Sequence, residues 1–301
     1  MDELTAFGLH YRRYLRGLEL AFKYLPFLTN VSPFKTIERR MSPFFKQVHA
    51  MSGSMAAVLP QAGVPEFRRA WLDSHALFAR HFLEYRRIDH DWVKKNVVVE
   101  EPALLKEVVE RGGVLLTYHT HHQNTLCCIL GVLGSKVSAV AAAPEASPLY
   151  PVIGTWAVRV NADSAIHFRG GRYIFTNDLR ALARDVRTAL QESSVVVCLA
   201  DFTQQGSKAP NQRLFGRYIS PPTGVIELGI KLETPFYFSV LAPESGVLKL
   251  KLRKFDDFSP SLNAVVSAYV SYLQECILVC PSLWQGWEWF GALPDVPESL
   301  S

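Results

Sequence analysis

The chain has 301 residues, of which 49% are hydrophobic and 20% are charged, and its formal net charge at neutral pH is +4. This composition excludes intrinsic disorder and is sufficient for the core of one large domain. The five cysteines are an odd number and lie in apolar segments, which predicts reduced, inert thiols in a cytoplasmic setting. Neither a secretory signal pattern nor an apolar run of membrane-spanning length is found, so we expect neither feature.

The positive charge is concentrated in residues 1–50, which hold eight Lys and Arg side chains against four Asp and Glu. Aromatic residues are interleaved with basic ones at positions 10–16. Such a segment can contact anionic lipid headgroups weakly or bind an acidic protein, and a solvated helix face is the plain alternative. No nucleic-acid recognition motif accompanies the charge, so no nucleic-acid partner is expected.

Residues 1–90 show the apolar spacing of amphipathic helices, which prolines divide into short pieces. No Gly/Ser-rich linker follows them. This helical N-terminal portion is therefore predicted to pack on an α/β core at 91–301 rather than to fold as an independent unit. Residues 96–99 predict a first strand. A helix is expected at about 102–111, with Pro102 at its start and Gly112 after its end.

Strands and helices then alternate along the chain. Strands are predicted at 114–118, 137–141, 194–199 and 236–242, and helices at 122–133, 179–190, 224–232 and 262–278. This alternation is typical of right-handed crossover units, so the predicted fold class is α/β, with a mainly parallel central sheet flanked by helices. Segment 247–252 alternates apolar and mostly charged residues, which predicts a half-exposed, antiparallel strand near a sheet edge.

A polar cluster follows the strand at 114–118, at the end where an α/β sheet carries its chemistry. His119 comes first, and histidine has the near-neutral pKa that a general base needs. Asn124 is placed to fix its tautomer if the intervening residues turn into a helix. His119, His121 and His122 also have the side chains of zinc ligands, but no second ligand cluster follows, so no metal is expected. A histidine that fills the core or caps a helix is the structural alternative.

The motif order over residues 60–290 resembles the lipid A late acyltransferase branch of the lysophospholipid acyltransferase superfamily. That family places a strand before a His-x4-Asp/Glu box, and here the box begins at His119 and ends at Asn124. The further motifs are matched, in order, at 168–172, 195–204, 214–216, 222–224 and 234–236, with a similar Trp-rich end at 284–290. The chain departs from the family at Asn124, where a carboxylate is usual. We also expect no N-terminal membrane anchor of the kind usual in that family.

The resemblance implies an acyltransferase that needs no cofactor and forms no covalent enzyme intermediate. Its acyl donor would be a thioester on an acyl carrier protein or on coenzyme A, and its acceptor a hydroxyl or amine of a lipid or of a carrier-tethered molecule. His119 would act as the general base. Without the anchor, the enzyme is expected to be cytoplasmic and at most peripheral on the inner face of the cytoplasmic membrane.

The same resemblance implies roles for other residues. Arg169 and Arg172 would bind a phosphate of the acceptor or of the phosphopantetheine arm. Asp201 would bind acceptor hydroxyls or order these arginines. Either backbone N–H groups near Thr223 and Gly224, at a helix start, or a nearby Arg would hold the oxyanion. Two surface arginines in a turn and a capping aspartate are the structural alternatives.

Asn124 can accept a hydrogen bond from an imidazole, but it cannot stabilise an imidazolium with a full negative charge. Another carboxylate, such as Asp201 or Glu145, would then have to compensate, unless the substrate demands less of its base or the activity is weak. The alternative function is a degenerate, non-catalytic family member that binds an acyl carrier or a lipid.

Overall fold

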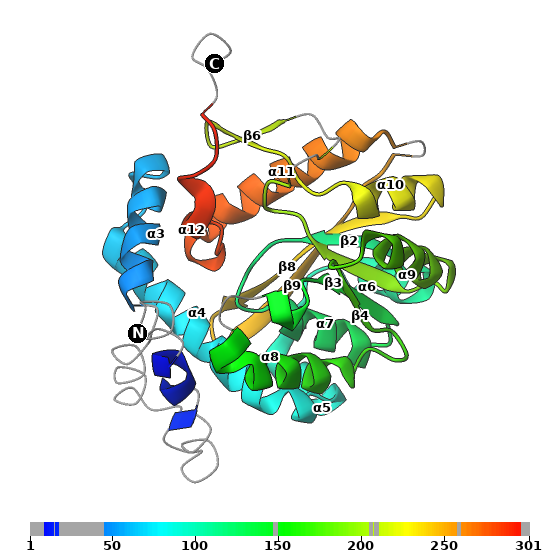
Figure 1. Ribbon diagram of the computed structural model, residues 1–301, viewed down its shortest axis with the longest axis horizontal. Helices are drawn as coiled ribbons and strands as arrows, with labels where there is room; N and C mark the ends of the chain where they lie inside the picture. Colours follow the sequence, from blue (N-terminus) through cyan, green and yellow to red (C-terminus); the bar gives the residue numbers. More distant parts are fainter. Residues whose placement is uncertain are drawn as a thin grey trace.

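The computed structural model describes residues 9–14, 16–17, 45–146, 150–204, 207, 211–257 and 260–295. Their main feature is a seven-stranded sheet in the order β1-β9-β8-β2-β5-β3-β4, with helices on both faces (Figure 1). Its strands are β1 (Val97–Val99), β2 (Gly113–Thr117), β3 (Val137–Ala141), β4 (Tyr173–Phe175), β5 (Val195–Leu199), β8 (Phe236–Glu244) and β9 (Val247–Lys254). All neighbouring pairs are parallel except β8 and β9. The predicted α/β class with a mainly parallel sheet is confirmed.

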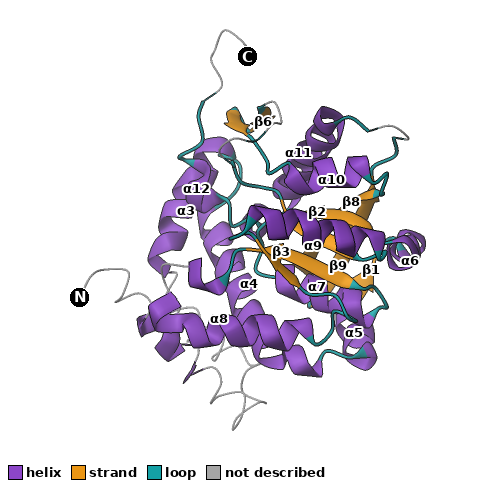
Figure 2. Cartoon of the chain, turned by 45° about the vertical axis from the view of Figure 1, so that its right-hand side comes forward, coloured by secondary structure: helices purple, strands orange, loops and turns teal. Residues whose placement is uncertain are grey.

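The helices form two layers around the sheet (Figure 2). One layer contains α9 (Leu179–Gln191), α10 (Gly224–Lys231) and α11 (Leu262–Val279), and the other contains α5 (His90–Asn96), α6 (Pro102–Arg111), α7 (Gln123–Val132) and α8 (Tyr150–Ala165). Side chains of β2 alternate between the two hydrophobic clusters, so that Val114 and Leu116 face the first layer and Leu115 the second. Because both faces of this central strand are covered, its residues 114–116 are all apolar.

The segment predicted at 247–252 forms β9, which is antiparallel to β8 and lies next to the edge strand β1. The helix α8, the strand β4 and a short hairpin of β6 (Gln212–Leu214) and β7 (Arg217–Ile219) are additional elements that the sequence pattern does not predict.

The helical N-terminal portion is confirmed where the structure describes it, as α3 (Phe45–Val58), α4 (Val64–Glu84) and η2 (Tyr85–Arg87). Helix α3 contacts α12 (Trp287–Phe290) (Figure 1). Helix α4 contacts η4 (Pro281–Leu283). Buried side chains of both helices, including Met55 and Trp71, belong to the same hydrophobic cluster as Trp284 and Trp287. The described helices therefore share a core with the sheet domain, while the predicted boundary at residue 90 stays a prediction.

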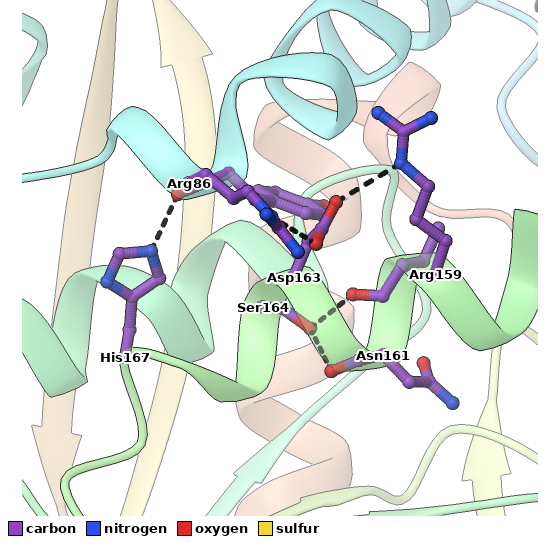
Figure 3. Close-up of polar contacts among 8 residues, drawn as sticks. Arg86, Arg159, Asn161, Asp163, Ser164 and His167 are labelled. Atoms are coloured by element: carbon purple, nitrogen blue, oxygen red, sulfur yellow. Dashed lines mark hydrogen bonds and ion pairs between the residues drawn. The ribbon is translucent and has the colours of Figure 1, made fainter.

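A polar cluster joins η2 to α8 across that predicted boundary (Figure 3). The buried carboxylate of Asp163 accepts hydrogen bonds from Arg86 Nε at 2.6 Å and from Arg159 Nε at 3.3 Å. His167 Nε2 donates to the backbone oxygen of Tyr85 at 2.6 Å. Since the cluster ties two helices together, we interpret it as structural.

Among the described helices, α11 alone is long and apolar enough to cross a membrane, by length and composition only. Its buried residues, such as Val266, Tyr269 and Leu273, belong to the core. Ser267 and Glu275 lie on its exposed side. This two-sided pattern is that of a helix that covers a sheet.

Gly171 lies between α8 and β4, where a Cβ atom would overlap the backbone oxygen of Val137 in β3. Gly171→Ala is expected to lower the free energy of unfolding by about 1–3 kcal/mol, because the backbone must move to relieve the overlap. Urea denaturation measures the change. The matched control is Gly53→Ala in α3, where a Cβ would meet open space. This change should raise stability by about 0.5–1 kcal/mol. An unchanged unfolding midpoint in Gly171→Ala would contradict the close packing of this turn.

Candidate functional site

The register of two neighbouring strands brings His119 and Asp201 together. In the parallel pair of β2 and β5, Thr117 is paired with Leu199. His119 and Asp201 are the second residues after Thr117 and Leu199. We therefore expect them to lie next to each other at the carboxyl edge of the sheet. The end of β2 is fixed further by the Tyr269 hydroxyl, which donates to the Thr117 carbonyl at 2.6 Å.

A chain of hydrogen bonds links His119, Asp201 and Trp284. His119 Nδ1 lies 2.6 Å from Asp201 Oδ1, and Trp284 Nε1 donates to Asp201 Oδ2 at 2.8 Å. The Asp201 side chain is fully buried, whereas that of His119 is 28% exposed. An ionised carboxylate only accepts hydrogen bonds, so Nδ1 carries a hydrogen and Nε2 of the neutral ring holds the lone pair. This tautomer is the one that a general base requires.

The environment of His119 shifts its pKa in two opposing ways. Burial alone would lower the pKa of His119, but the negative charge of Asp201 and the hydrogen bond to it outweigh burial, so the pKa is raised. The pair is therefore built to stabilise a positive charge on the imidazole. This is the demand placed on a base that removes a proton in a transition state.

The Trp-rich segment encloses His119 from a second direction. The backbone N–H of Gln285 donates to the His119 carbonyl at 3.0 Å. The imidazole packs edge-on with the ring of Trp289 at 5.3 Å and with that of Phe202 at 5.9 Å. This segment is one of the features that resemble the family, but no site residue is expected in it from the sequence. Its buried tryptophans are the signal that points to a packed element, but their partners are visible only in the fold.

Asn124 does not fix the tautomer of His119, so that expectation is wrong. Asn124 is the second residue of α7, and no hydrogen bond joins it to His119 in the part of the chain that the structure describes. The Nδ1 atom is held by Asp201 instead, which supplies the compensating carboxylate. Glu145, the other acidic residue considered, is exposed in η3 (Pro144–Ala146). Any catalytic role of Asn124 stays a prediction.

Asp201 itself differs from its expected role. Both of its oxygens accept hydrogen bonds from protein donors, and it has no exposed surface with which to bind acceptor hydroxyls. The arrangement makes Asp201 a partner of His119 rather than a residue that contacts a substrate.

Arg169 and Arg172 lie at the opposite edge of the sheet from His119, which corrects their predicted position. They precede β4, and β4 is parallel to β3, so they stand where these strands begin. Arg172 is 59% exposed and pairs with Asp185 at 3.3 Å, and Arg169 is exposed in a turn with a φ of 52°. The sequence pattern identified the two arginines. It did not predict the direction of β4, which places them at the edge of the sheet away from the site.

Thr223 and Gly224 lie at the same edge as His119, because α10 starts there and runs back to the beginning of β8. Thr223 Oγ1 donates to Glu227 Oε1 at 3.0 Å, and the space around Gly224 is open. A Cβ-free helix start at this edge is compatible with binding an oxyanion. That role remains a prediction.

His121 and His122 contact α4, whereas His119 contacts Asp201. His121 Nδ1 and His122 Nε2 both lie 3.2 Å from Ser74 Oγ, and all three side chains are buried. Within the described ranges, no group of three or more His, Cys, Asp or Glu side chains is arranged to hold a metal ion. The three histidines of the His-x-His-His pattern therefore do not share one site.

The five cysteines form no disulfide. Burial raises the pKa of Cys127 and that of Cys198 to about 12. A thiol with such a pKa is not a nucleophile at neutral pH. The expectation of inert thiols is confirmed for these two residues.

A cavity of about 280 Å³ lies between β8, β9 and α11. Its apolar lining includes Tyr118, the residue before His119, and Leu283, the residue before Trp284. Arg253 and Glu275, which pair at 2.6 Å, lie on its charged side. A larger cavity of about 520 Å³ lies where β8 begins, at the edge away from His119.

No protein-family model matches the chain, and no curated protein sequence matches it significantly. Among solved structures, the 1-acyl-sn-glycerophosphate acyltransferase PlsC from Thermotoga maritima is similar, with a TM-score of 0.37 and 14% sequence identity. The similarity covers 83% of this chain and 96% of that one. A likeness this distant does not transfer an activity or a substrate.

Proposed function

We propose that the protein is an acyltransferase that moves an acyl group from a thioester donor to a hydroxyl or amine acceptor. The observation that carries this proposal is the hydrogen-bonded pair of a partly exposed His119 and a fully buried Asp201 at the carboxyl edge of the sheet. A base held in one tautomer and paired with a buried charge serves direct acyl transfer, as the resemblance to the lysophospholipid acyltransferases implies.

In the proposed reaction, His119 Nε2 removes the proton of the acceptor hydroxyl or amine while the acceptor atom bonds to the thioester carbonyl carbon. Asp201 stabilises the imidazolium that forms. The tetrahedral intermediate then expels the thiolate, which takes the proton from Nε2, so His119 returns to its neutral form. Backbone N–H groups at Thr223 and Gly224 are the proposed donors to the oxyanion.

The cavity beside Tyr118 is the proposed place for an alkyl chain, because part of its lining is apolar and Tyr118 directly precedes His119 in the chain. The proposed donors are acyl carrier protein and acyl-CoA, and the proposed acceptors are a lipid or a carrier-tethered molecule. Peripheral contact with anionic membranes through residues 1–50 remains part of the proposal. Most of that segment lies outside the described residues.

A non-catalytic lipid or carrier binder is the less favoured function. Burying a carboxylate such as Asp201 is unfavourable unless the carboxylate is paired. A histidine without a chemical role does not need a buried carboxylate as its partner. The His119–Asp201 pair therefore favours an enzyme.

The test is turnover with acyl carrier thioesters or acyl-CoA and a panel of hydroxyl and amine acceptors, with products identified by mass spectrometry. The parent protein should form an acylated acceptor. His119→Gln should lower the rate by about 10²–10⁴-fold, the usual contribution of a general base. The control is His90→Gln, an exposed histidine at the start of α5, which should keep the parent rate. Full activity in His119→Gln would overturn the mechanism.

A further inference from the structure

The segment from η4 to α12 contacts the His119–Asp201 pair at three points. Trp284 Nε1 donates to Asp201 Oδ2, the backbone N–H of Gln285 donates to the His119 carbonyl, and Trp289 packs on the imidazole. The first contact involves the carboxylate itself. It is therefore the one that can change the electrostatics of the pair.

Trp284 has little freedom to move. It is fully buried, and its ring packs edge-on against Trp287 at 4.9 Å and Phe290 at 5.9 Å. A Cβ atom on Gly286 would overlap the indole, so the backbone folds closely around the ring. The N–H group of Trp284 is thus held in a fixed direction towards Asp201.

A buried carboxylate is stabilised by every donor that reaches it, because water cannot replace a lost hydrogen bond. Asp201 has two such donors, the imidazole of His119 and the indole of Trp284. If the indole donor is removed, the carboxylate attracts a proton more strongly. The shared proton of the His119–Asp201 pair is then held more tightly, whichever of the two residues carries it.

We propose that Trp284 is a positioning residue, whose indole N–H fixes the orientation of Asp201. The indole N–H also stabilises the negative charge of the carboxylate as a second hydrogen-bond donor beside His119. This inference rests on the proposed acyl transfer. Trp284 touches neither the substrate nor the reacting atoms in this scheme, and it acts on His119 through Asp201.

Trp284→Phe removes the N–H group and keeps an aromatic ring in the cluster. The expected result is a 10- to 100-fold loss in kcat, about the effect of one hydrogen bond to a buried charge, with little change in KM. The rising limb of the pH–rate profile should move to higher pH, because the pair releases its proton less readily. A purely structural role would not move that limb.

The matched control is Trp287→Phe. Trp287 lies in the same aromatic cluster and donates a hydrogen bond to the Pro281 carbonyl at 2.8 Å, but not to Asp201. This variant should lose thermal stability and keep the parent pH–rate limb. Equal shifts of the limb in the two variants would overturn the proposal, as would an unchanged profile in Trp284→Phe.

NMR titration of the His119 ring separates this inference from the acyl transfer on which it rests. Absence of turnover in the parent would contradict the proposed function, whereas an unshifted His119 titration in Trp284→Phe would contradict the role of Trp284. If Trp284→Phe does not fold, the indole N–H signals of the parent decide. The Trp284 signal should follow the titration of His119 and the Trp287 signal should not, and independence of the Trp284 signal would overturn the proposal.

Discussion

Asp201→Asn is expected to lower the rate of acyl transfer by about 10⁴-fold, the effect of the equivalent change in serine protease triads. The carboxylate accepts one hydrogen bond on each oxygen, from His119 and from Trp284. An amide has a single acceptor oxygen, so its NH₂ group must face one of these donors. If it faces His119, the imidazole turns to the tautomer with its proton on Nε2, which cannot act as a base. Steady-state kinetics with any substrate found for the parent measures the loss.

The matched comparison is at Asn124. The family that this sequence resembles carries its carboxylate at that position. Since Asp201 already holds Nδ1, Asn124→Ala and Asn124→Asp should each change the rate far less than Asp201→Asn does. Circular dichroism and thermal melting check that Asp201→Asn remains folded. A severe loss in Asn124→Ala beside a mild one in Asp201→Asn would show that the base depends on the amide instead.

Stability is expected to fall steeply below pH 6 because histidines are buried between α4 and the loop after β2. Burial lowers the pKa of His75 to about 3. Burial, followed by the charges of His75 and His122, lowers the pKa of His121 well below its ordinary value. In the unfolded chain these rings take up protons near pH 6.5, so acid favours unfolding. His75 alone should remove about 2–3 kcal/mol between pH 6.5 and 4.5.

Urea denaturation at several pH values measures this slope. His75→Phe keeps a ring against Trp71, with which His75 stacks at 5.7 Å, and removes the titrating group. It should therefore flatten the dependence on pH. The same slope in His75→Phe as in the parent would contradict the assignment.

Local patterns in the sequence were sufficient to predict most of the central sheet. Strand 137–141 and helix 102–111 are found with the predicted bounds, because hydrophobic periodicity and flanking Pro and Gly act within a few residues. The helix α8 was missed for the opposite reason. Its sequence contains Pro, Gly and five β-branched residues, so its local helix preference is weak and packing against η2 and α7 decides its structure.

The same division holds for the site. The sequence alone determined that His119 follows a buried strand at the carboxyl edge and that Asp201 follows another, since both statements depend on adjacent residues. It did not determine that the two side chains meet. They are 82 residues apart in the chain, and strand order and register bring them together. The direction of β4 likewise places Arg169 and Arg172 at the edge of the sheet opposite His119. The fold of the C-terminal segment places Trp284 against Asp201. Residue type and periodicity are local properties, whereas contacts between distant segments exist only once the sheet has formed.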